Sequence, residues 1–178
     1  MNRVLARLAA LACALTLGSC SGGAPVASER RPPSESAVPI PVGAQVARVE
    51  RIVDGDTMWV RPTGAGPLRV GVRAKVRLLE YDTPERGECY FTEATNQLAK
   101  LTPVGTAVSL LADRDPVDRY GRALRYVWSS SGVFVDREMV ELGMGRSLLV
   151  APNAAHIGVI RRAEERARAA GRGLWGAC

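Results

Sequence analysis

The chain has 178 residues and carries 24 basic and 18 acidic side chains, which gives a formal net charge of +6 and an isoelectric point of about 9.6. The part after residue 43 has the size of one domain with a single core. The basic balance is compatible with a polyanionic partner, and equally with an Arg-rich composition, because the bias is spread over the whole chain. His156 is the only histidine, which excludes zinc hydrolases, two-histidine ribonucleases and histidine-metal nucleases.

Residues 1–19 have the layout of a bacterial export signal. Arg3 and Arg7 precede an apolar run, Leu8 to Leu17, which is too short to span a bilayer as a helix. The run ends in Leu17-Gly18-Ser19-Cys20, which resembles a lipoprotein cleavage site and predicts that Cys20 becomes the acylated first residue. An ordinary secretory signal is the alternative. In both cases the mature chain leaves the cytoplasm, and with lipidation it stays anchored to a membrane in the cell envelope.

The segment 20–43 is rich in Ser, Gly, Ala and Pro and has almost no large apolar residues before Val38. Such a composition cannot bury enough apolar surface to offset the entropy lost on ordering. We therefore predict a disordered tether between the lipid anchor and a folded domain over residues 44–178.

Four cysteines have different predicted fates. Cys13 is removed with the signal and Cys20 is lipidated, which leaves Cys89 and Cys178 in an oxidising compartment. A disulfide between these two would close a long loop, with up to roughly 4–5 kcal/mol of stabilisation in the chain-entropy model. Redox catalysis is disfavoured because the chain has no Cys-x-x-Cys pair.

Short apolar runs with period two come first in the domain, and helical spacing follows. The predicted strands are Gln45 to Val53, Thr57 to Arg61, Leu68 to Leu79, Thr106 to Leu111 and Ala123 to Trp128; the predicted helices are Phe91 to Leu101, Val135 to Leu142 and Asn153 to Ala170. Asn153 is the expected N-cap of the last helix, and Gly171 is its expected stop. Five strands with interleaved helices predict an α+β domain, a small barrel with packed helices.

One predicted strand delivers a carboxylate to the barrel rim. It ends at Asp82 because Pro84 lacks the N–H that a ladder needs and restricts the residue before it. Asp56, Asp82 and Glu85 can then converge with Arg77 on a pocket that holds a hard cation beside an anion. Oxygen ligands select calcium or magnesium, and a calcium site tolerates irregular geometry.

A phosphodiester suits such a pocket, because its catalyst must neutralise an anion and supply an attacking water. Arg77 and Arg122 present planar forks that bind phosphate oxygens in pairs. Glu85 is placed to hold or deprotonate the water. Asp54 is expected to orient metal-bound waters, and Tyr120 to donate a hydrogen bond to a phosphate or only to pack.

Each of these residues also has a purely structural interpretation. Asp54 and Asp56 could simply form a turn, Arg77 could pair with Glu80 on a strand surface, and residues 120–122 could be only a strand entry. The set of matched spacings favours a site over these alternatives.

Three motifs together resemble the staphylococcal nuclease (thermonuclease) family. They are Asp54-Gly55-Asp56, the run from Arg77 to Glu85, and Asp118-Arg119-Tyr120-Gly121-Arg122, in this order and at these spacings. The resemblance covers about residues 44–175 and implies a five-stranded OB-fold barrel with three helices, calcium dependence, and hydrolysis of DNA and RNA. It also implies the Thr83 carbonyl as a third calcium ligand beside Asp56 and Asp82.

The chain departs from the family at the nucleotide pocket. Where the best-known member has two tyrosines near the start of the last helix, this chain has Leu148 and Val150. Base stacking is therefore expected to be weaker, and nucleotide inhibitors should bind less tightly.

The sequence thus predicts an exported, membrane-tethered, calcium-dependent nuclease that acts on DNA, RNA or both, with magnesium as the less favoured cation. We expect a monomer. The alternatives are a non-catalytic nucleic-acid-binding OB-fold lipoprotein and a structural lipoprotein of the envelope. The combination of Glu85 with Arg77 and Arg122 favours the enzyme. A protein that only binds nucleic acid has no use for a carboxylate such as Glu85 next to a polyanion.

Overall fold

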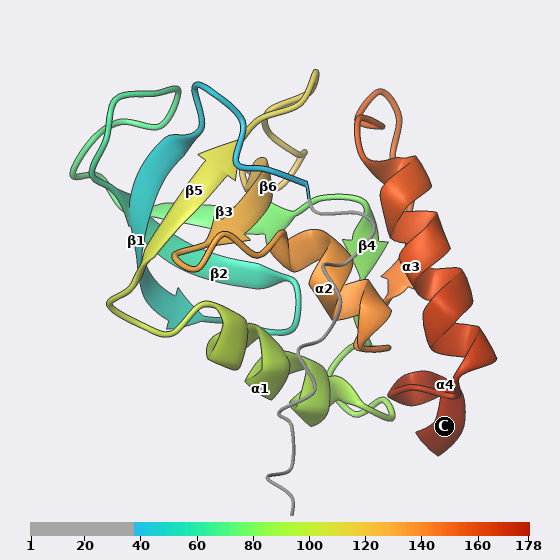
Figure 1. The fold of residues 1–178 in the computed structure, drawn as a ribbon. Helices are drawn as coiled ribbons and strands as arrows, with labels where there is room; N and C mark the ends of the chain where they lie inside the picture. Colours follow the sequence, from blue (N-terminus) through green and yellow to red (C-terminus); the bar gives the residue numbers. More distant parts are fainter. Residues whose placement is uncertain (1–37) are drawn as a thin grey trace, which may run out of the picture. The chain divides into compact units, whose positions relative to one another are not determined.

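The computed structural model describes residues 38–178, in which five strands close into a barrel (Figure 1). In the order of their hydrogen bonding the strands are β1 (Gln45–Ile52), β2 (Thr57–Pro62), β3 (Ala74–Leu78), β6 (Ala123–Ser129) and β5 (Ala107–Leu111), and β5 returns to β1. The β3–β6 pair is parallel and the other neighbours are antiparallel. The predicted α+β class with a five-stranded OB-type barrel is confirmed. The predicted signal and Cys20 lie outside the described residues.

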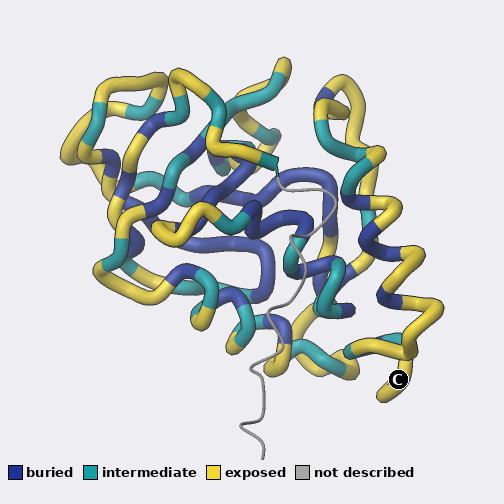
Figure 2. The backbone as a smooth tube through the Cα atoms, in the orientation of Figure 1, coloured by how far each residue is buried: buried dark blue, intermediate teal, exposed yellow. Residues whose placement is uncertain are grey.

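Alternation along the strands separates the barrel interior from its outer face. Inward positions such as Val49, Met58 and Val76 are at most 1% exposed, whereas Arg48 and Arg61 on the outer face are exposed. In Figure 2 the buried residues concentrate in the barrel strands and in the helix beside them. Each Å² of apolar surface that is buried stabilises the folded state by about 25 cal/mol, which makes this interior the main stabilising element of the fold.

The third strand is shorter than the sequence pattern predicts. It begins at Ala74 and not at Leu68, because the preceding residues form the loop that connects it to β2. The buried Gln45 side chain occupies the backbone groups of that loop: its Nε2 donates to the carbonyls of Gly64 (2.9 Å) and Leu68 (2.7 Å), and its Oε1 accepts from the Leu68 N–H (2.9 Å). Those groups are not available for a strand ladder.

Three helices pack on the barrel, and a fourth short one ends the chain. They are α1 (Phe91–Leu101), α2 (Val135–Glu141), α3 (Ile157–Ala169) and α4 (Leu174–Ala177). The prediction for α3 was wrong at its start, because the Asn153 side chain does not cap the helix. It binds Asp115 instead, donating to its carbonyl (2.9 Å) and accepting from its N–H (2.8 Å). Within residues 38–178, no helix has the length and apolar character needed to cross a membrane.

Two short elements are not predicted as separate strands, because the run expected to end at Asp82 breaks after Leu78. β4 (Tyr81–Asp82) and β7 (Arg146–Ser147) form a separate two-stranded sheet, with Asp82 opposite Arg146. Strands of two residues carry no periodicity, so sequence patterns cannot detect them. This small sheet fixes the backbone at Asp82 against the segment that leads into α3.

Helix α2 is joined to the barrel through a buried carboxylate. Asp136 is fully buried, and its two oxygens accept from the backbone N–H groups of Leu79 (3.0 Å) and Val127 (2.8 Å). Burial raises the pKa of Asp136 well above its ordinary value, although these hydrogen bonds act in the opposite direction. The contact positions α2 at the ends of β3 and β6.

The predicted disulfide between Cys89 and Cys178 is confirmed. The two Cα atoms lie 6.0 Å apart, and the bond joins residues separated by 89 positions. It attaches the end of α4 to the loop that carries Glu85, so most of the domain lies within the closed loop.

Candidate functional site

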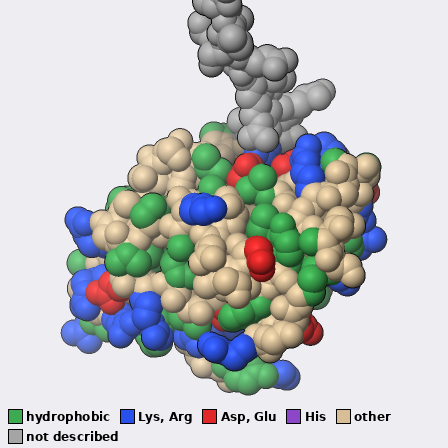
Figure 3. Space-filling model, turned by 90° about the horizontal axis from the view of Figure 1, so that it is seen from below, with side chains coloured by type: hydrophobic (Ala, Val, Ile, Leu, Met, Phe, Trp, Pro, Cys, Tyr) green, Lys and Arg blue, Asp and Glu red, His purple; other side chains and the backbone are tan. Residues whose placement is uncertain are grey.

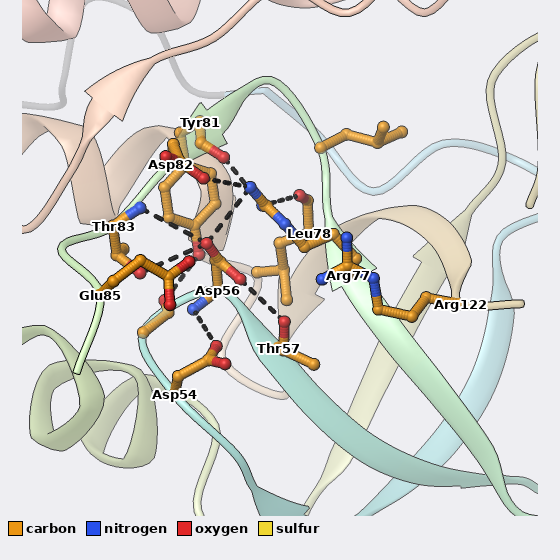
Figure 4. Close-up of polar contacts among 12 residues, drawn as sticks. Asp54, Asp56, Thr57, Arg77, Leu78, Tyr81, Asp82, Thr83, Glu85 and Arg122 are labelled. Atoms are coloured by element: carbon orange, nitrogen blue, oxygen red, sulfur yellow. Dashed lines mark hydrogen bonds and ion pairs between the residues drawn. The ribbon is translucent and has the colours of Figure 1, made fainter. Parts of the chain in front are cut away.

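Three segments bring the predicted site residues together at one end of the barrel (Figure 4). Asp56 directly precedes β2, Arg77 lies on β3 opposite Thr57, and Asp82 ends β4. Because the β2–β3 register places the start of β2 beside the end of β3, the turn before β2 and the segment after β3 meet at the same rim. The structure therefore gathers Asp56, Arg77 and Asp82 as the sequence predicts.

The Arg77 guanidinium is the centre of this group. Its Nη2 lies 2.6 Å from Asp82 Oδ1 and 3.2 Å from Asp56 Oδ2. Its Nη1 donates to the carbonyls of Leu78 (2.7 Å) and Tyr81 (2.8 Å). The Arg77 side chain is only 11% exposed, so four contacts in a partly dehydrated setting fix its orientation.

Arg77 does not pair with Glu80, which was the structural alternative. Glu80 is buried, and its Oε1 accepts from the Tyr126 hydroxyl and from the His156 N–H. The His156 ring packs against Tyr126 and Phe134, with centroid distances of 4.6 and 5.0 Å. The single histidine therefore packs in an aromatic cluster beside Glu80.

Asp56 is held by its neighbours on both sides. Thr57 Oγ1 donates to Asp56 Oδ1 (2.8 Å), while the backbone N–H and Oγ1 of Thr83 approach Oδ2 at 3.4 and 3.3 Å. Thr83 thus lies next to Asp56 in space and follows Asp82 in the chain. A ligand set shared by the three residues requires this proximity. Its carbonyl as a ligand stays a prediction.

The turn before β2 depends on Asp54 and Gly55. Asp54 Oδ1 accepts from the Asp56 N–H at 3.1 Å, so Asp54 does form the turn, next to the carboxylate cluster. A Cβ at Gly55 would lie 2.8 Å from the Ala94 Cβ and from the Thr83 Cγ2. Glycine is required because α1 and the Thr83 side chain pack directly on the turn.

The cluster contains more carboxylates than cations. Burial, together with the charge of Asp56, raises the pKa of Asp54. Burial also raises the pKa of Asp82; Asp56 acts in the same direction, and Arg77 in the opposite one. A divalent cation would relieve this repulsion, and an all-oxygen donor set is what calcium and magnesium prefer.

The side-chain ligands for a cation are few. Within residues 38–178, no group of three or more His, Cys, Asp or Glu side chains has an arrangement that could hold a metal ion. Asp56 and Asp82 converge on one guanidinium nitrogen, and further donors would come from backbone carbonyls and water. A shell of two carboxylates completed by carbonyls and water suits either calcium or magnesium.

Glu85 lies on the exposed loop after β4. Its backbone N–H donates to Glu88 Oε2 at 2.7 Å, which shapes the loop. In Figure 4 the Glu85 carboxylate points toward Asp56. Glu85 is therefore exposed to water and directed at the same centre as the other carboxylates.

Arg122 is positioned by Asp118, to which the sequence analysis gave no role. Arg122 Nε donates to Asp118 Oδ2 (2.6 Å), while Asp118 Oδ1 accepts from the backbone N–H groups of Tyr120 and Arg122, both at 2.9 Å. Gly121 completes the turn with φ +77°. The Asp-x-x-Gly-Arg spacing is the signal that could have identified this turn.

Tyr120 lies outside the cluster. It is 67% exposed, and its hydroxyl accepts from Arg119 Nη2 at 2.6 Å. The guanidinium groups of Arg119 and Arg122 lie 4.8 and 5.5 Å from its ring centroid. Its ring therefore contacts these arginines, and its role as a donor to a phosphate stays a prediction.

A cavity of about 270 Å³ adjoins the cluster. Arg77, Asp82, Asp118 and Arg122 contribute to its charged part, and Leu124, Leu148 and Val150 to its apolar part. Leu148 and Val150 are 40% and 56% exposed. Two arginines next to aliphatic side chains suit an anion that carries an organic group.

The comparisons with known proteins agree with this geometry. The family model described as staphylococcal nuclease homologue matches residues 75–177. A thermonuclease from Staphylococcus intermedius is 29% identical over 132 residues, which are 71% of this chain and 74% of the relative. An uncharacterized endonuclease from Haemophilus influenzae is 30% identical over 128 residues (72% and 65%), and Protein ParB from Escherichia coli is 32% identical over 135 residues (71% and 70%).

Replacing Asp118 with Asn should lower the free energy of unfolding by about 1–2 kcal/mol at neutral pH, because three donors lose a charged acceptor. Partial burial alone would raise the pKa of Asp118, but its hydrogen bonds with Arg122 and Tyr120 lower it below 3.8. The contribution is therefore present above the unfolded pKa and is lost as the pH falls through the lower folded pKa.

Urea unfolding of the parent and Asp118→Asn at pH 7, 5 and 3 measures this difference. The gap should be equal at pH 7 and 5 and smaller at pH 3. A gap that does not change with pH would show that the carboxylate charge is not what stabilises the turn.

Proposed function

The chain belongs to the family of staphylococcal nuclease homologues, and we propose that it is an exported, membrane-tethered nuclease that uses calcium to hydrolyse phosphodiester bonds of DNA, RNA or both. The observation that carries this proposal is the Arg77 guanidinium fixed between Asp56 and Asp82, with Arg122 on the same cavity. The printed names of the thermonuclease and endonuclease relatives support nuclease activity.

The two arginines bind the phosphate in this proposal. Arg77 is held by two backbone carbonyls and two carboxylates, so its fork is oriented before substrate arrives. Arg122 is oriented by Asp118 at the start of the same turn. Both guanidinium groups stabilise the additional negative charge that develops as a fifth oxygen approaches phosphorus.

Calcium would be held by Asp56, Asp82 and the Thr83 carbonyl. When bound, the cation neutralises the phosphate and lowers the pKa of a coordinated water. Asp54 fixes the turn that presents Asp56, and its carboxylate lies close enough to the cluster to orient waters around the cation.

Glu85 holds the attacking water and accepts its proton. The carboxylate is exposed and points toward Asp56 (Figure 4), so a water placed between them would be hydrogen-bonded to Glu85. A carboxylate in this role is expected to contribute about 10²- to 10⁴-fold to the rate.

A non-catalytic nucleic-acid-binding barrel is the second candidate, since barrels of this type also serve only to bind. The unbalanced carboxylates around Arg77 oppose it, because they repel a polyanion unless a cation is present. Hydrolysis of an oligonucleotide therefore separates the two candidates.

Two substitutions test the catalytic roles of Glu85 and Arg122. Glu85→Gln and Arg122→Ala should each reduce the hydrolysis rate of single-stranded DNA, duplex DNA and RNA by at least about 100-fold, because one removes the base and the other a phosphate ligand. The rates are measured with calcium, with magnesium and with a chelator.

Matched variants control for nonspecific effects of these changes. Glu93→Gln alters an exposed glutamate on α1, and Arg119→Ala alters the exposed arginine three residues before Arg122. Both controls should keep the parent rate. Full activity in Glu85→Gln or Arg122→Ala would remove that residue from the mechanism, and binding without hydrolysis by the parent chain would favour the second candidate.

A substitution at Asp82 tests the cation site. Asp82→Ala should raise the calcium concentration needed for half-maximal activity by at least about tenfold, because one of two carboxylate ligands is lost. Asp115→Ala changes an exposed aspartate outside the cluster and should leave the calcium titration unchanged. An identical titration for Asp82→Ala would show that Asp82 is not a ligand.

A substitution at Cys20 tests the membrane anchor. Cys20→Ser should move the protein from the membrane fraction to the soluble exported fraction and remove the mass of the attached lipid, whereas Cys13→Ser should have no effect on the mature chain. Fractionation and intact mass of the mature protein measure both. A soluble parent chain with an unmodified N-terminus would favour an ordinary secretory signal.

A further inference from the structure

One outer face of the barrel carries a set of basic side chains around a tryptophan. In the strand registers Arg48 lies opposite Arg61, Arg51 opposite Trp59, and Trp59 opposite Lys75. Directly opposite residues share one face of a sheet. We call the set the basic sheet face: Arg48, Arg51, Trp59, Arg61, Arg73 and Lys75.

The basic sheet face has little compensating negative charge. Glu50 pairs with Arg61 (2.5 Å) and with Arg73 (3.1 Å). Among residues 38–178, neither Arg51 nor Lys75 has an ion-pair partner. Lys and Arg side chains also gather along the left edge of Figure 3, the side on which Figure 1 places β1.

Three arginines in and after α3 are arranged differently. Arg166 and Arg172 both pair with Glu141, and Arg168 pairs with Glu164. These three arginines are matched by carboxylates, whereas Arg51 and Lys75 on the basic sheet face are not.

Trp59 gives this face an aromatic surface. The Arg73 guanidinium lies 4.3 Å from the Trp59 ring centroid. Trp59 is half-buried on the outer side of the sheet. Aromatic rings flanked by cations are the platforms on which single-stranded nucleic acids stack their bases.

The basic sheet face is continuous with the candidate active site. Lys75 precedes Arg77 by two residues on β3, so both lie on the same side of the strand, about 7 Å apart along it. Trp59 follows Thr57 by two residues, and Thr57 lies opposite Arg77. A strand bound at Arg77 therefore reaches Lys75 and then Trp59 without leaving the sheet.

We propose that the basic sheet face is an extended binding surface for single-stranded nucleic acid, on which Arg51 and Lys75 contact phosphates and Trp59 stacks a base. The proposal rests on the nuclease function proposed above and adds a second contact region for the same strand. Its ligand is the sugar-phosphate chain beyond the phosphodiester at Arg77. Binding there is largely independent of sequence, because phosphates and base faces carry little sequence information.

The test measures binding of a fluorescent single-stranded 20-mer and of a trinucleotide in the presence of calcium. The protein is the mature chain with Glu85→Gln, so that the strand stays intact, and it is compared with the same chain carrying Arg51→Ala and Lys75→Ala. The 20-mer should bind the parent more tightly than the trinucleotide does. In the double variant its affinity should fall roughly tenfold, and the slope of log K against log salt should decrease by about 1.4.

The matched control is Arg162→Ala with Lys100→Ala, which also removes one exposed Arg and one exposed Lys, from α3 and α1. This control should keep the affinity and the salt slope of the parent. Trp59→Ala should weaken 20-mer binding about tenfold, and Trp59→Phe should restore most of it, because phenylalanine keeps an aromatic ring.

The outcomes separate the two proposals. If the parent chain hydrolyses nucleic acid while the double variant binds the 20-mer as tightly as its control, the basic sheet face is rejected and the nuclease function stands. If the wild-type chain hydrolyses no nucleic acid with any cation, the nuclease function falls, and this inference with it. If the double variant loses binding to phosphatidylglycerol vesicles but not to the 20-mer, the face binds a membrane and the inference is overturned.

Discussion

The shared guanidinium of Arg77 is the interaction on which the site depends. Asp56 and Asp82 come from segments on either side of β3, and both lie against the same nitrogen, at 3.2 and 2.6 Å. A charge that is mostly removed from water requires such partners, since an uncompensated buried charge costs several kcal/mol. On our proposal, the two carboxylates gathered by this contact would share a cation. The ion pair is thus both a stabilising contact of the barrel rim and the geometry that the proposed chemistry requires.

The surrounding fold keeps this geometry rigid. The β2–β3 register places the turn at Gly55 beside the end of β3, α1 packs on that turn, and the β4–β7 pair fixes the backbone at Asp82. The bond between Cys89 and Cys178 joins the loop of Glu85 to the last helix. Each support comes from a different part of the chain, so the positions of the carboxylates depend on the whole domain having folded.

Sequence patterns predict the elements of this domain that have a periodic arrangement of apolar residues, and the positions where that arrangement ends. Alternation of apolar and polar residues locates the barrel strands. The sequence Asp82-Thr83-Pro84 marks where a carboxylate meets the rim. The start of β3 could not be predicted, because the buried Gln45 side chain binds the loop that precedes it. Asn153 has an ordinary capping composition, yet its partner is Asp115, distant in sequence. Such side-chain contacts to distant backbone override local preference.

Two features change where a base can stack, compared with the nucleotide pocket expected for the family. Leu148 and Val150 give the cavity beside Arg77 an aliphatic wall, which offers apolar contact but no ring on which a base can stack. Trp59 places a ring on the neighbouring sheet face instead, next to Arg73 and in line with Lys75 and Arg77. On our proposal, the contacts that retain the strand lie along β2 and β3, and the cavity has only to admit the group next to the reacting phosphate. Retention then depends on chain length and salt, as is expected when phosphates supply most of the binding free energy.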